Sequence, residues 1–537
     1  MQAAPTAHLD TFARDHLPPR ELWPEFDLSG VPGLAGRPRI NAAAELLDAR
    51  VAAGDGDRPA LVFPGGRWTY AELLENANRV AGVLRDELGL VPGNRVLLRG
   101  FNSPMMAAAW FGVLKAGGIV VATMPLLRSR EIQTLVSRAR VRFALCDARL
   151  MEEMPSHAVE QTVVFGGDGE DSLERRMARQ PATFANVDTS AEDVAIFAFT
   201  SGTTGQPKGA MHFHRDLLAC VDTFSAHVLR PGPDDLFCGS PPLAFTFGLG
   251  GYLLFPMRVG AATLLLETAA PPQLLAGIQE HRATVVFTAP TAYRAMAAMA
   301  KDFDLSSLRK CVSAGEALPL ATFEAWRDAT GLSIIDGIGS TEILHIFISA
   351  SGGDIRPGST GRAVPGYTAT LLDEQGRPVP PGELGRLAIR GPTGCRYLDD
   401  PERQRKYVEN GWNITGDTYR MDEDGYFWYQ ARSDDMIISA GYNIAGPEVE
   451  NALLEHPGVL ECACVADPDE ERGHVVKAFV VLRPDWTPGD ATVKVLQEFV
   501  KKQIAPYKYP RRVEFVEALP RTATGKLQRF RLRETAG

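Results

Sequence analysis

The sequence lacks an apolar run long enough to cross a membrane. Apolar stretches such as residues 117–122 and 259–266 are far shorter than the roughly 20 residues that a transmembrane helix needs. Residues 1–28 contain acidic residues, prolines and arginines but no continuous apolar segment, so we expect no secretory signal. These absences predict a cytoplasmic protein that does not act at a membrane.

The chain also lacks an excess of basic residues and a metal-binding cysteine pattern. Its net charge of −10 argues against a nucleic-acid-binding protein, although a local basic face could still exist. The seven cysteines are scattered, which fits a reducing compartment, and we interpret them as small core or surface residues. With 537 residues, 45% of them hydrophobic, the chain is long enough for several globular domains. It could be a monomer or a homodimer.

The order of apolar segments predicts an α/β fold, because short apolar segments alternate with amphipathic ones as in parallel βαβ units. One series has expected strands at 60–63, 68–70, 95–98, 119–122 and 143–146, and expected helices at 72–88, 103–116 and 128–139. A second series has expected strands at 194–199, 236–240, 262–266, 284–287 and 310–313, and expected helices at 216–227 and 248–259. We therefore predict two α/β lobes before residue ~360, without a sequence repeat.

Two smaller units are expected after these lobes. Residues 369–373 and 385–390 are β-like with turn-rich joints, which predicts a small barrel-like subdomain. The last hundred residues contain their own expected elements, namely helices at 446–456 and 492–503 and strands at 461–466 and 475–482. We place the boundary in the charged segment 431–435. This gives an N-terminal domain of residues 1–433 and a mobile C-terminal domain of residues 434–537.

A glycine-rich loop follows the expected strand 194–199. Its candidate ligand-binding residues are Thr200, Ser201, Gly202, Thr203, Thr204 and Lys208. Glycines allow backbone N–H groups to approach an anion, the hydroxyls add donors and the lysine adds a positive charge, which together suit a polyphosphate. The loop is not a P-loop, because Pro207 precedes the lysine and Gly209 follows it. Taken alone, it could be an ordinary surface turn.

Four further motifs follow in order. Small residues at 313–317 would let a flat base approach the backbone, and residues 336–342 combine glycines with a hydroxyl and a carboxylate. Residues 412–417 place a carboxylate at a tight turn, where it could bind ribose hydroxyls, and residues 520–526 place a lysine on a loop. Each motif also has a purely structural alternative. Residues 313–317 could be a strand-to-helix turn and residues 336–342 could contain a helix cap. Asp417 could simply form a turn, and the lysine of 520–526 could simply be solvated.

In this order, the five motifs resemble those of the ANL adenylating enzymes, which include acyl-CoA synthetases, peptide-synthetase adenylation domains and firefly luciferase. The resemblance implies an acid–thiol ligase that uses ATP, Mg²⁺ and CoA. It implies that catalytic Lys526 bridges the substrate carboxylate and the α-phosphate, that Thr341 binds the α-phosphate, and that Glu342 holds Mg²⁺. The implied nucleotide-binding residues further along the chain are Gly315, Glu316, Ala317, Asp336, Gly337, Ile338, Gly339, Ser340, Asp417 and Arg432. Ile338 stands where the family usually has an aromatic residue.

The implied reaction has two steps. A carboxylate attacks the α-phosphorus of ATP, an approach of anion to anion that cationic groups must neutralise, and no general base is needed because a carboxylate is already ionised at neutral pH. A thiol then displaces AMP. The resemblance implies that the C-terminal domain rotates about hinge residue Asp434 between these steps and brings Gly441 and Tyr442 to the CoA tunnel. A carrier-protein phosphopantetheine is an alternative acceptor, and a non-catalytic nucleotide-binding regulator is an alternative class.

The acyl pocket is expected at residues 242–248, at 314–315 and on an expected helix at 343–347. No aspartate stands between 245 and 255, which disfavours an α-amino acid substrate. Residues 245–250 and 337–347 resemble benzoate-CoA and 2-aminobenzoate-CoA ligases, which implies that the ring is surrounded by Phe245, Thr246, Phe247, Ala314, Gly315, Gly339, His345 and Ile346.

The benzoate enzymes tend to have Ala-Tyr at the positions of Thr246 and Phe247, so we favour 2-aminobenzoate (anthranilate) over benzoate or another substituted benzoate. His345 could instead be a core histidine bonded to a backbone carbonyl.

Overall fold

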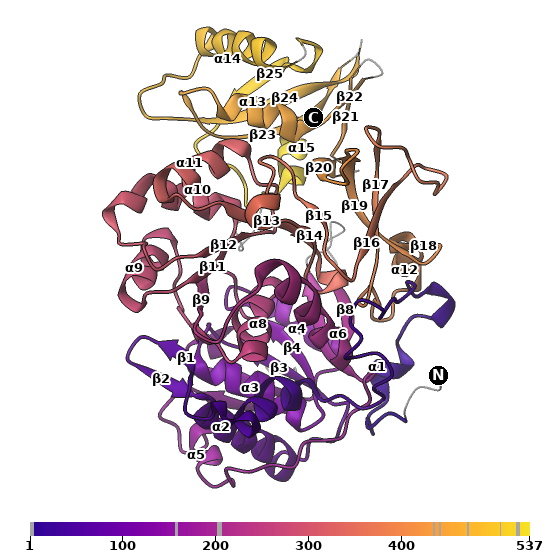
Figure 1. Cartoon of the computed structure of the whole chain (residues 1–537), viewed down its shortest axis with the longest axis vertical. Coiled ribbons are helices and arrows are strands. Elements are labelled where there is room, and N and C mark those ends of the chain that lie inside the picture. Colours follow the sequence, from indigo (N-terminus) through magenta and orange to yellow (C-terminus); the bar gives the residue numbers. More distant parts are fainter. Residues whose placement is uncertain are drawn as a thin grey trace.

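The computed structural model describes residues 5–155, 159–200, 207–432, 435–439, 442–469, 472–504, 506–521 and 527–536. Two large sheets with their helices and a β-rich unit form the body of the molecule, and the C-terminal residues form a small lobe at one end (Figure 1). One hydrophobic core contains buried side chains from both large sheets, and each sheet also contributes to a separate core of its own. In the parts of the chain described here, no helix has both the length and the apolar character needed to span a bilayer.

The first sheet has the strand order β6-β5-β3-β4-β7-β8. Its strands are β3 (Arg95–Arg99), β4 (Ile119–Thr123), β5 (Phe143–Asp147), β6 (Gln161–Phe165), β7 (Val194–Thr200) and β8 (Lys208–Phe213). Neighbouring strands are parallel except for the β7–β8 hairpin, whose second strand the sequence analysis missed. This antiparallel strand departs from the parallel pattern that we expected after the glycine-rich loop.

The second sheet has the order β15-β14-β13-β12-β11-β9-β10-β1-β2. Its strands are β1 (Pro59–Phe63), β2 (Gly66–Thr69), β9 (Leu236–Gly239), β10 (Ala262–Leu264), β11 (Val285–Thr288), β12 (Lys310–Ser313), β13 (Ile334–Gly339), β14 (Ile346–Ser349) and β15 (Arg362–Ala363). Strand β1 pairs in parallel with β10, so the first strands of the chain belong to the second lobe. The predicted elements are confirmed, but the two lobes are not consecutive in sequence.

The helices cover the faces of these sheets. They are α1 (Phe12–Asp15), α2 (Tyr70–Gly82), α3 (Pro104–Lys115), α4 (Ser129–Ala139), α5 (Leu173–Met177), α6 (His214–Cys220), α7 (Thr246–Leu249), α8 (Phe255–Val259), α9 (Pro271–His281), α10 (Pro290–Met299) and α11 (Leu320–Thr330). Several continue as π-helical segments, including η6 (Val221–Leu229) and η7 (Gly250–Leu254). Local signals explain their starts: Thr69 and Glu72 form a capping box on α2, and Ser103 caps α3.

The expected helix at 343–347 is wrong. Residues Thr341–Ile343 form one 3-10 turn, η9, and the chain then enters β14, which is antiparallel to β13. Leu344 has a φ of +80°, which ends the helical turn. The following Ile346, Phe347 and Ile348 are β-branched or aromatic residues that favour a strand.

The predicted β-rich unit is a five-stranded antiparallel sheet. Its strands are β16 (Thr368–Leu372), β17 (Leu384–Arg390), β18 (Val408–Glu409), β19 (Trp412–Met421) and β20 (Phe427–Arg432), with α12 (Pro401–Tyr407) beside them. The small lobe contains β21 (Ile437–Ser439), β22 (Tyr442–Ile444), α13 (Gly446–Leu454), β23 (Val459–Asp469), β24 (Gly473–Leu482), α14 (Asp490–Gln503), β25 (Arg512–Phe515) and α15 (Arg529–Ala536). The expected strands and helices of both units are confirmed.

The small lobe meets the body near α10 and α11 (Figure 1). Arg521 of the small lobe lies 3.5 Å from Glu316 of the body and 2.9 Å from Glu461 of its own lobe. Beside this contact is an interdomain cleft, lined by Arg294, Ala297, Ala298, Ala321, Thr322, Ala325, Leu454 and Arg483. Within the described ranges, neither arginine of the cleft has an ion-pair partner.

All seven cysteines are buried and unpaired, which confirms their interpretation as small core residues.

Candidate active site

Thr341 and Glu342, here called the Thr-Glu pair, lie on the short turn η9 between β13 and β14. We call this segment the Thr-Glu turn. Ser340 caps this turn, because its hydroxyl accepts a hydrogen bond from the Ile343 N–H at 3.2 Å. The Tyr397 hydroxyl donates to Glu342 Oε1 at 2.7 Å. The imidazole Nε2 of His212 lies 2.7 Å from the Thr341 carbonyl oxygen. Neighbours from distant parts of the chain therefore hold both residues of the pair.

The glycine-rich loop begins beside this turn. Thr200 at the end of β7 pairs with Lys208 at the start of β8, and residues 201–206 lie outside the described residues. In the part of the chain that the structure describes, the half-buried Lys208 has no ion-pair partner. Residues 396–398 run along β8, with hydrogen bonds of 2.8 Å from Leu398 N to Gly209 O and from Met211 N to Arg396 O. This pairing brings Tyr397 next to the loop.

Asp417 and Arg432 are paired positions on β19 and β20. Arg432 Nη1 lies 3.4 Å from Asp417 Oδ1 and 3.2 Å from the Thr415 carbonyl oxygen. Gly416, which precedes Asp417, has a φ of +77°, and a Cβ there would lie 2.9 Å from the Arg432 guanidinium. Glycine is therefore required at this turn. Asp417 and Arg432, two of the implied nucleotide-binding residues, are thus in contact.

Tyr407 connects this pair with Glu342. Its hydroxyl lies 3.2 Å from the Ser340 hydroxyl. Burial raises the pKa of Tyr407 well above its usual value, and the carboxylates of Glu342 and Asp417 raise it further. The phenol therefore stays protonated.

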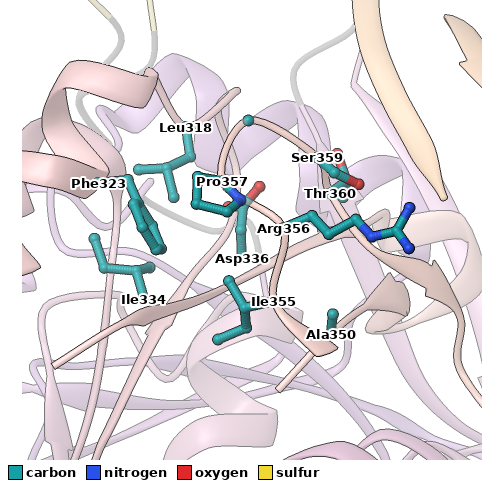
Figure 2. Close-up of a pocket in the computed structure, with 11 residues that line it drawn as sticks. Leu318, Phe323, Ile334, Asp336, Ala350, Ile355, Arg356, Pro357, Ser359 and Thr360 are labelled. Atoms are coloured by element: carbon teal, nitrogen blue, oxygen red, sulfur yellow. The ribbon is translucent and has the colours of Figure 1, made fainter. Parts of the chain in front are cut away.

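Residues 315–317 follow β12, and residues 336–339 belong to β13, with Ile338 half-buried against the core. Asp336 lines a small cavity, where Figure 2 shows it between Leu318, Phe323 and Ile334 on one side and Ser359 and Thr360 on the other. Burial raises the pKa of Asp336 to about 7, although the nearby Ser313 hydroxyl opposes the shift. Glu316 contacts Arg521, as described above, so this segment also touches the small lobe.

His345 lies in a cage of aromatic rings. Its ring centroid is 4.6 Å from that of Phe255, 5.6 Å from that of Phe224 and 5.7 Å from that of Phe247. Burial lowers the pKa of His345 to about 3, so the imidazole is uncharged at neutral pH. Neither ring nitrogen has a hydrogen-bond partner among the residues described. The backbone of Phe247 opposes this lowering of the pKa, so a core histidine beside a backbone carbonyl stays an alternative interpretation of His345.

Other predicted acyl-pocket residues lie close to His345. Gly339 and Ile346 are paired positions on β13 and β14, and Phe245 precedes α7, on which Thr246 and Phe247 lie. Phe247 packs against the same core as the buried Ala314 at the end of β12. The structure thus brings most of this set to one place.

Several predicted site residues cannot be placed. Ser201, Gly202, Thr203, Thr204, Asp434, Gly441 and Lys526 lie outside the described residues, and of Tyr442 only the backbone, in β22, is described. The described residues contain no group of three or more potential metal ligands. Glu342 alone still fits Mg²⁺, which usually takes one or two carboxylates and completes its shell with water and substrate phosphates. Tyr397 occupies one oxygen of this carboxylate and leaves the other available.

The sequence analysis missed His212, Tyr397 and Tyr407. Each makes its contact with the Thr-Glu turn through chain segments that are far apart in sequence. The only local signal is that Tyr397 and Tyr407 belong to a polar segment around the helix α12. Tyr397 precedes its cap Asp400, and Tyr407 is its last residue.

Comparison with known proteins places this geometry in a family. The family described as "AMP-binding enzyme" matches residues 48–396, and "AMP-binding enzyme C-terminal domain" matches residues 448–526. The benzoate–CoA ligase of Thauera aromatica is 37% identical over 508 residues, which cover 92% of this chain and 96% of the relative.

Two solved structures have the same mixed α/β fold with a large N-terminal and a small C-terminal domain. The anthranilate CoA ligase AuaEII in complex with anthranoyl-AMP has a TM-score of 0.88 and 38% identity, covering 93% of this chain and 97% of that one. A benzoate CoA ligase from Burkholderia xenovorans LB400 has a TM-score of 0.85 and 34% identity, covering 92% of this chain and 100% of that one. The predicted fold class is confirmed, and the chain belongs to the AMP-binding enzymes of the ANL adenylating superfamily.

Proposed function

We propose that this protein joins an aromatic carboxylic acid to CoA through an aroyl-adenylate and releases AMP and pyrophosphate. Its family makes it an AMP-forming acid–CoA ligase that uses ATP, Mg²⁺ and CoA. One observation carries the aromatic assignment: an uncharged His345 caged by phenylalanine rings lies three residues after Glu342. An apolar, flat-walled site of this kind suits an aryl ring and gives no partner to an ammonium group.

In the first half-reaction, cationic groups let two anions meet. We assign Lys208 to the β- and γ-phosphates, Thr341 to the α-phosphate, and Lys526 to both the attacking carboxylate and the α-phosphate. Glu342 would hold Mg²⁺, which neutralises phosphate charge when it is bound. Among the described residues, Lys208 has no ion-pair partner and one oxygen of Glu342 accepts the Tyr397 hydroxyl, and both observations support these roles.

The nucleoside would lie along β13 and β19. We assign Asp417, with Arg432, to the ribose hydroxyls, and residues 315–317 and 336–340 to the base, where Ile338 supplies an aliphatic contact. Asp434 is the proposed hinge between the domains 1–433 and 434–537, and Gly441 and Tyr442 are the proposed lining of the CoA tunnel. These roles follow from the family resemblance.

For the acid, we propose 2-aminobenzoate, with benzoate as an equally supported alternative. The structure similar to this chain at a TM-score of 0.88 carries anthranoyl-AMP, whereas the 37% identical relative is named for benzoate. A 3-hydroxybenzoate–CoA ligase of Aromatoleum sp. (strain CIB) is 32% identical over 92% of this chain and 97% of its own length.

A panel of acids tests the proposal. ATP–pyrophosphate exchange should be fastest with 2-aminobenzoate or benzoate, slower with 2-hydroxybenzoate, and close to background with hexanoate. Addition of CoA should then convert the adenylate into the thioester. A preference for hexanoate would overturn the aryl assignment, and exchange without thioester formation would overturn the CoA assignment.

Gly250→Ala is expected to impair use of the acid more than use of ATP. A Cβ on Gly250 would lie 2.4 Å from His345 Cδ2 and 2.5 Å from Nε2, so the imidazole must move. Such overpacking typically costs about 1–3 kcal/mol. We therefore expect kcat/KM for the aromatic acid to fall about tenfold while KM for ATP changes less than about twofold.

Steady-state kinetics with each substrate varied in turn measure this difference. Gly353→Ala is the matched control, because a Cβ there meets nothing within 4 Å. Equal losses toward the acid and ATP would show that His345 does not line the acid site.

A further inference from the structure

We propose that Tyr397 and His212, which lie on two segments joined by the buried Asp216–Arg396 ion pair, are positioning residues that hold Glu342 and Thr341 for adenylation. This inference rests on the proposed function of the Thr-Glu pair. The four residues come from two segments: His212 and Asp216 span the β8–α6 junction, and Arg396 and Tyr397 are adjacent in sequence.

Tyr397 fixes the direction of the Glu342 carboxylate. Its hydroxyl donates to Oε1 at 2.7 Å, and its ring, 1% exposed, packs edge-on against Tyr407. Burial raises the pKa of Tyr397, so its hydroxyl keeps its proton and remains a donor. One oxygen of Glu342 is thereby tied to the protein while the other remains available for a cation.

His212 fixes the backbone of the neighbouring residue. A carbonyl oxygen can only accept, so His212 Nε2 carries the hydrogen that it donates to the Thr341 carbonyl at 2.7 Å. The imidazole is fully buried, and its Nδ1 lies 3.8 Å from Asp216 Oδ2, beyond hydrogen-bonding distance. The Thr341 peptide is therefore attached to strand β8, the strand that begins with Lys208.

The ion pair connects the two chain segments that carry His212 and Tyr397. Asp216 and Arg396 are both completely buried and in direct contact. Asp216 Oδ2 also accepts the Phe213 N–H at 2.9 Å, and the Arg396 guanidinium lies 3.8 Å from the centroid of the Phe213 ring. Burial alone would raise the pKa of Asp216, but Arg396 and His212 keep it below its usual value, so the carboxylate stays charged.

Tyr397 and His212 thus hold the Thr-Glu turn at two points, the Glu342 carboxylate and the Thr341 carbonyl. The turn itself is a single 3-10 turn that ends at the positive φ of Leu344, so it has little regular hydrogen bonding of its own. A catalytic group on such a turn must be oriented by residues around it. The buried pair fixes both of these residues relative to β8.

Tyr397→Phe tests the carboxylate attachment by removing one oxygen atom. We expect the affinity for ATP in the presence of Mg²⁺ to fall about tenfold, because a hydrogen bond to a charged group is lost. Without Mg²⁺, ATP binding should be unchanged, as should the midpoint of thermal unfolding to within a few degrees. Isothermal titration calorimetry of ATP with Mg²⁺ and with a chelator measures this difference.

The matched control is Tyr70→Phe, which removes another buried hydroxyl, bonded to the Ala261 carbonyl at 2.6 Å away from the turn. It should bind ATP like the wild type in both conditions. Wild-type affinity of Tyr397→Phe for ATP with Mg²⁺, or an equal loss with and without Mg²⁺, would overturn the proposal. Because this assay contains no acid, it is independent of whether the substrate is aromatic.

A pair of substitutions at His212 tests the second attachment. In His212→Gln the side-chain amide can still donate near the position of Nε2, whereas His212→Leu cannot donate. We expect His212→Gln to retain most of the ATP–pyrophosphate exchange rate and His212→Leu to lose at least about tenfold. Equal rates in the two variants would exclude a role for the hydrogen bond to Thr341.

Discussion

Lys526→Ala is expected to lower the rate of aroyl-adenylate formation by about 10²–10³, the usual effect of removing one preorganised charge donor. Without this lysine, the substrate carboxylate must approach the α-phosphate with its negative charge uncompensated on that side. In the proposed arrangement Lys208 and Glu342 act on other parts of the triphosphate, so neither should replace Lys526. ATP–pyrophosphate exchange with the preferred aromatic acid measures the loss.

The second half-reaction distinguishes a catalytic role of Lys526 in adenylation from a purely structural role. In the proposed rotated arrangement Lys526 leaves the site, so Lys526→Ala should convert supplied aroyl-adenylate and CoA into thioester at close to the wild-type rate. Lys502→Ala, on the exposed side of α14, is the control for loss of a positive charge from the small lobe. Near-normal pyrophosphate exchange, or equal loss of both half-reactions, would contradict the assignment.

Glu342→Gln is expected to lower kcat/KM for adenylation by about 10²-fold, through loss of the negative charge that would hold Mg²⁺. A glutamine has the same size, and its carbonyl oxygen can still accept the Tyr397 hydroxyl, so the turn should keep its shape. The variant should therefore need a much higher Mg²⁺ concentration for half-maximal pyrophosphate exchange.

Titration of Mg²⁺ at saturating ATP measures that requirement. Glu409→Gln is the control, because Glu409 is a half-buried carboxylate of the β-rich unit that pairs with Arg386 at 2.8 Å. It should show the wild-type Mg²⁺ dependence. An unchanged Mg²⁺ requirement in Glu342→Gln would remove Glu342 from the metal site.

Local sequence patterns predicted the elements of the fold better than their arrangement. The strands near 95–98 and 284–287 were recognisable because short apolar runs, at 96–98 and 285–287, lie between polar residues. The membership of β1 in the second sheet was not, since its pairing with β10 joins residues about 200 positions apart. The expected helix at 343–347 failed because the unusual φ of Leu344 depends on tertiary contacts.

In the candidate site, too, individual residues were predictable from motifs, whereas contacts between distant segments were not. Asp417 and Arg432 were singled out by motif and family resemblance, and the structure places them at paired positions. Tyr397 lies 55 positions from Glu342, and His212 lies 129 positions from Thr341, so no local pattern could connect them. The aromatic surroundings of the His345 ring were likewise unpredictable, because three phenylalanines from different segments form them.

The interdomain cleft bears on how firmly the small lobe is held. Arg294 from the body and Arg483 from the lobe both line the cleft and carry like charges. Burial lowers the pKa of Arg294, and the nearby positive charge of Arg483 also lowers it. Across the same junction, Arg521 attracts Glu316. Dissolved ions screen solvent-exposed charges over about 8 Å at physiological ionic strength, so they weaken the repulsion and the attraction together. Salt therefore changes the net charge interaction across this junction less than it changes either contact alone.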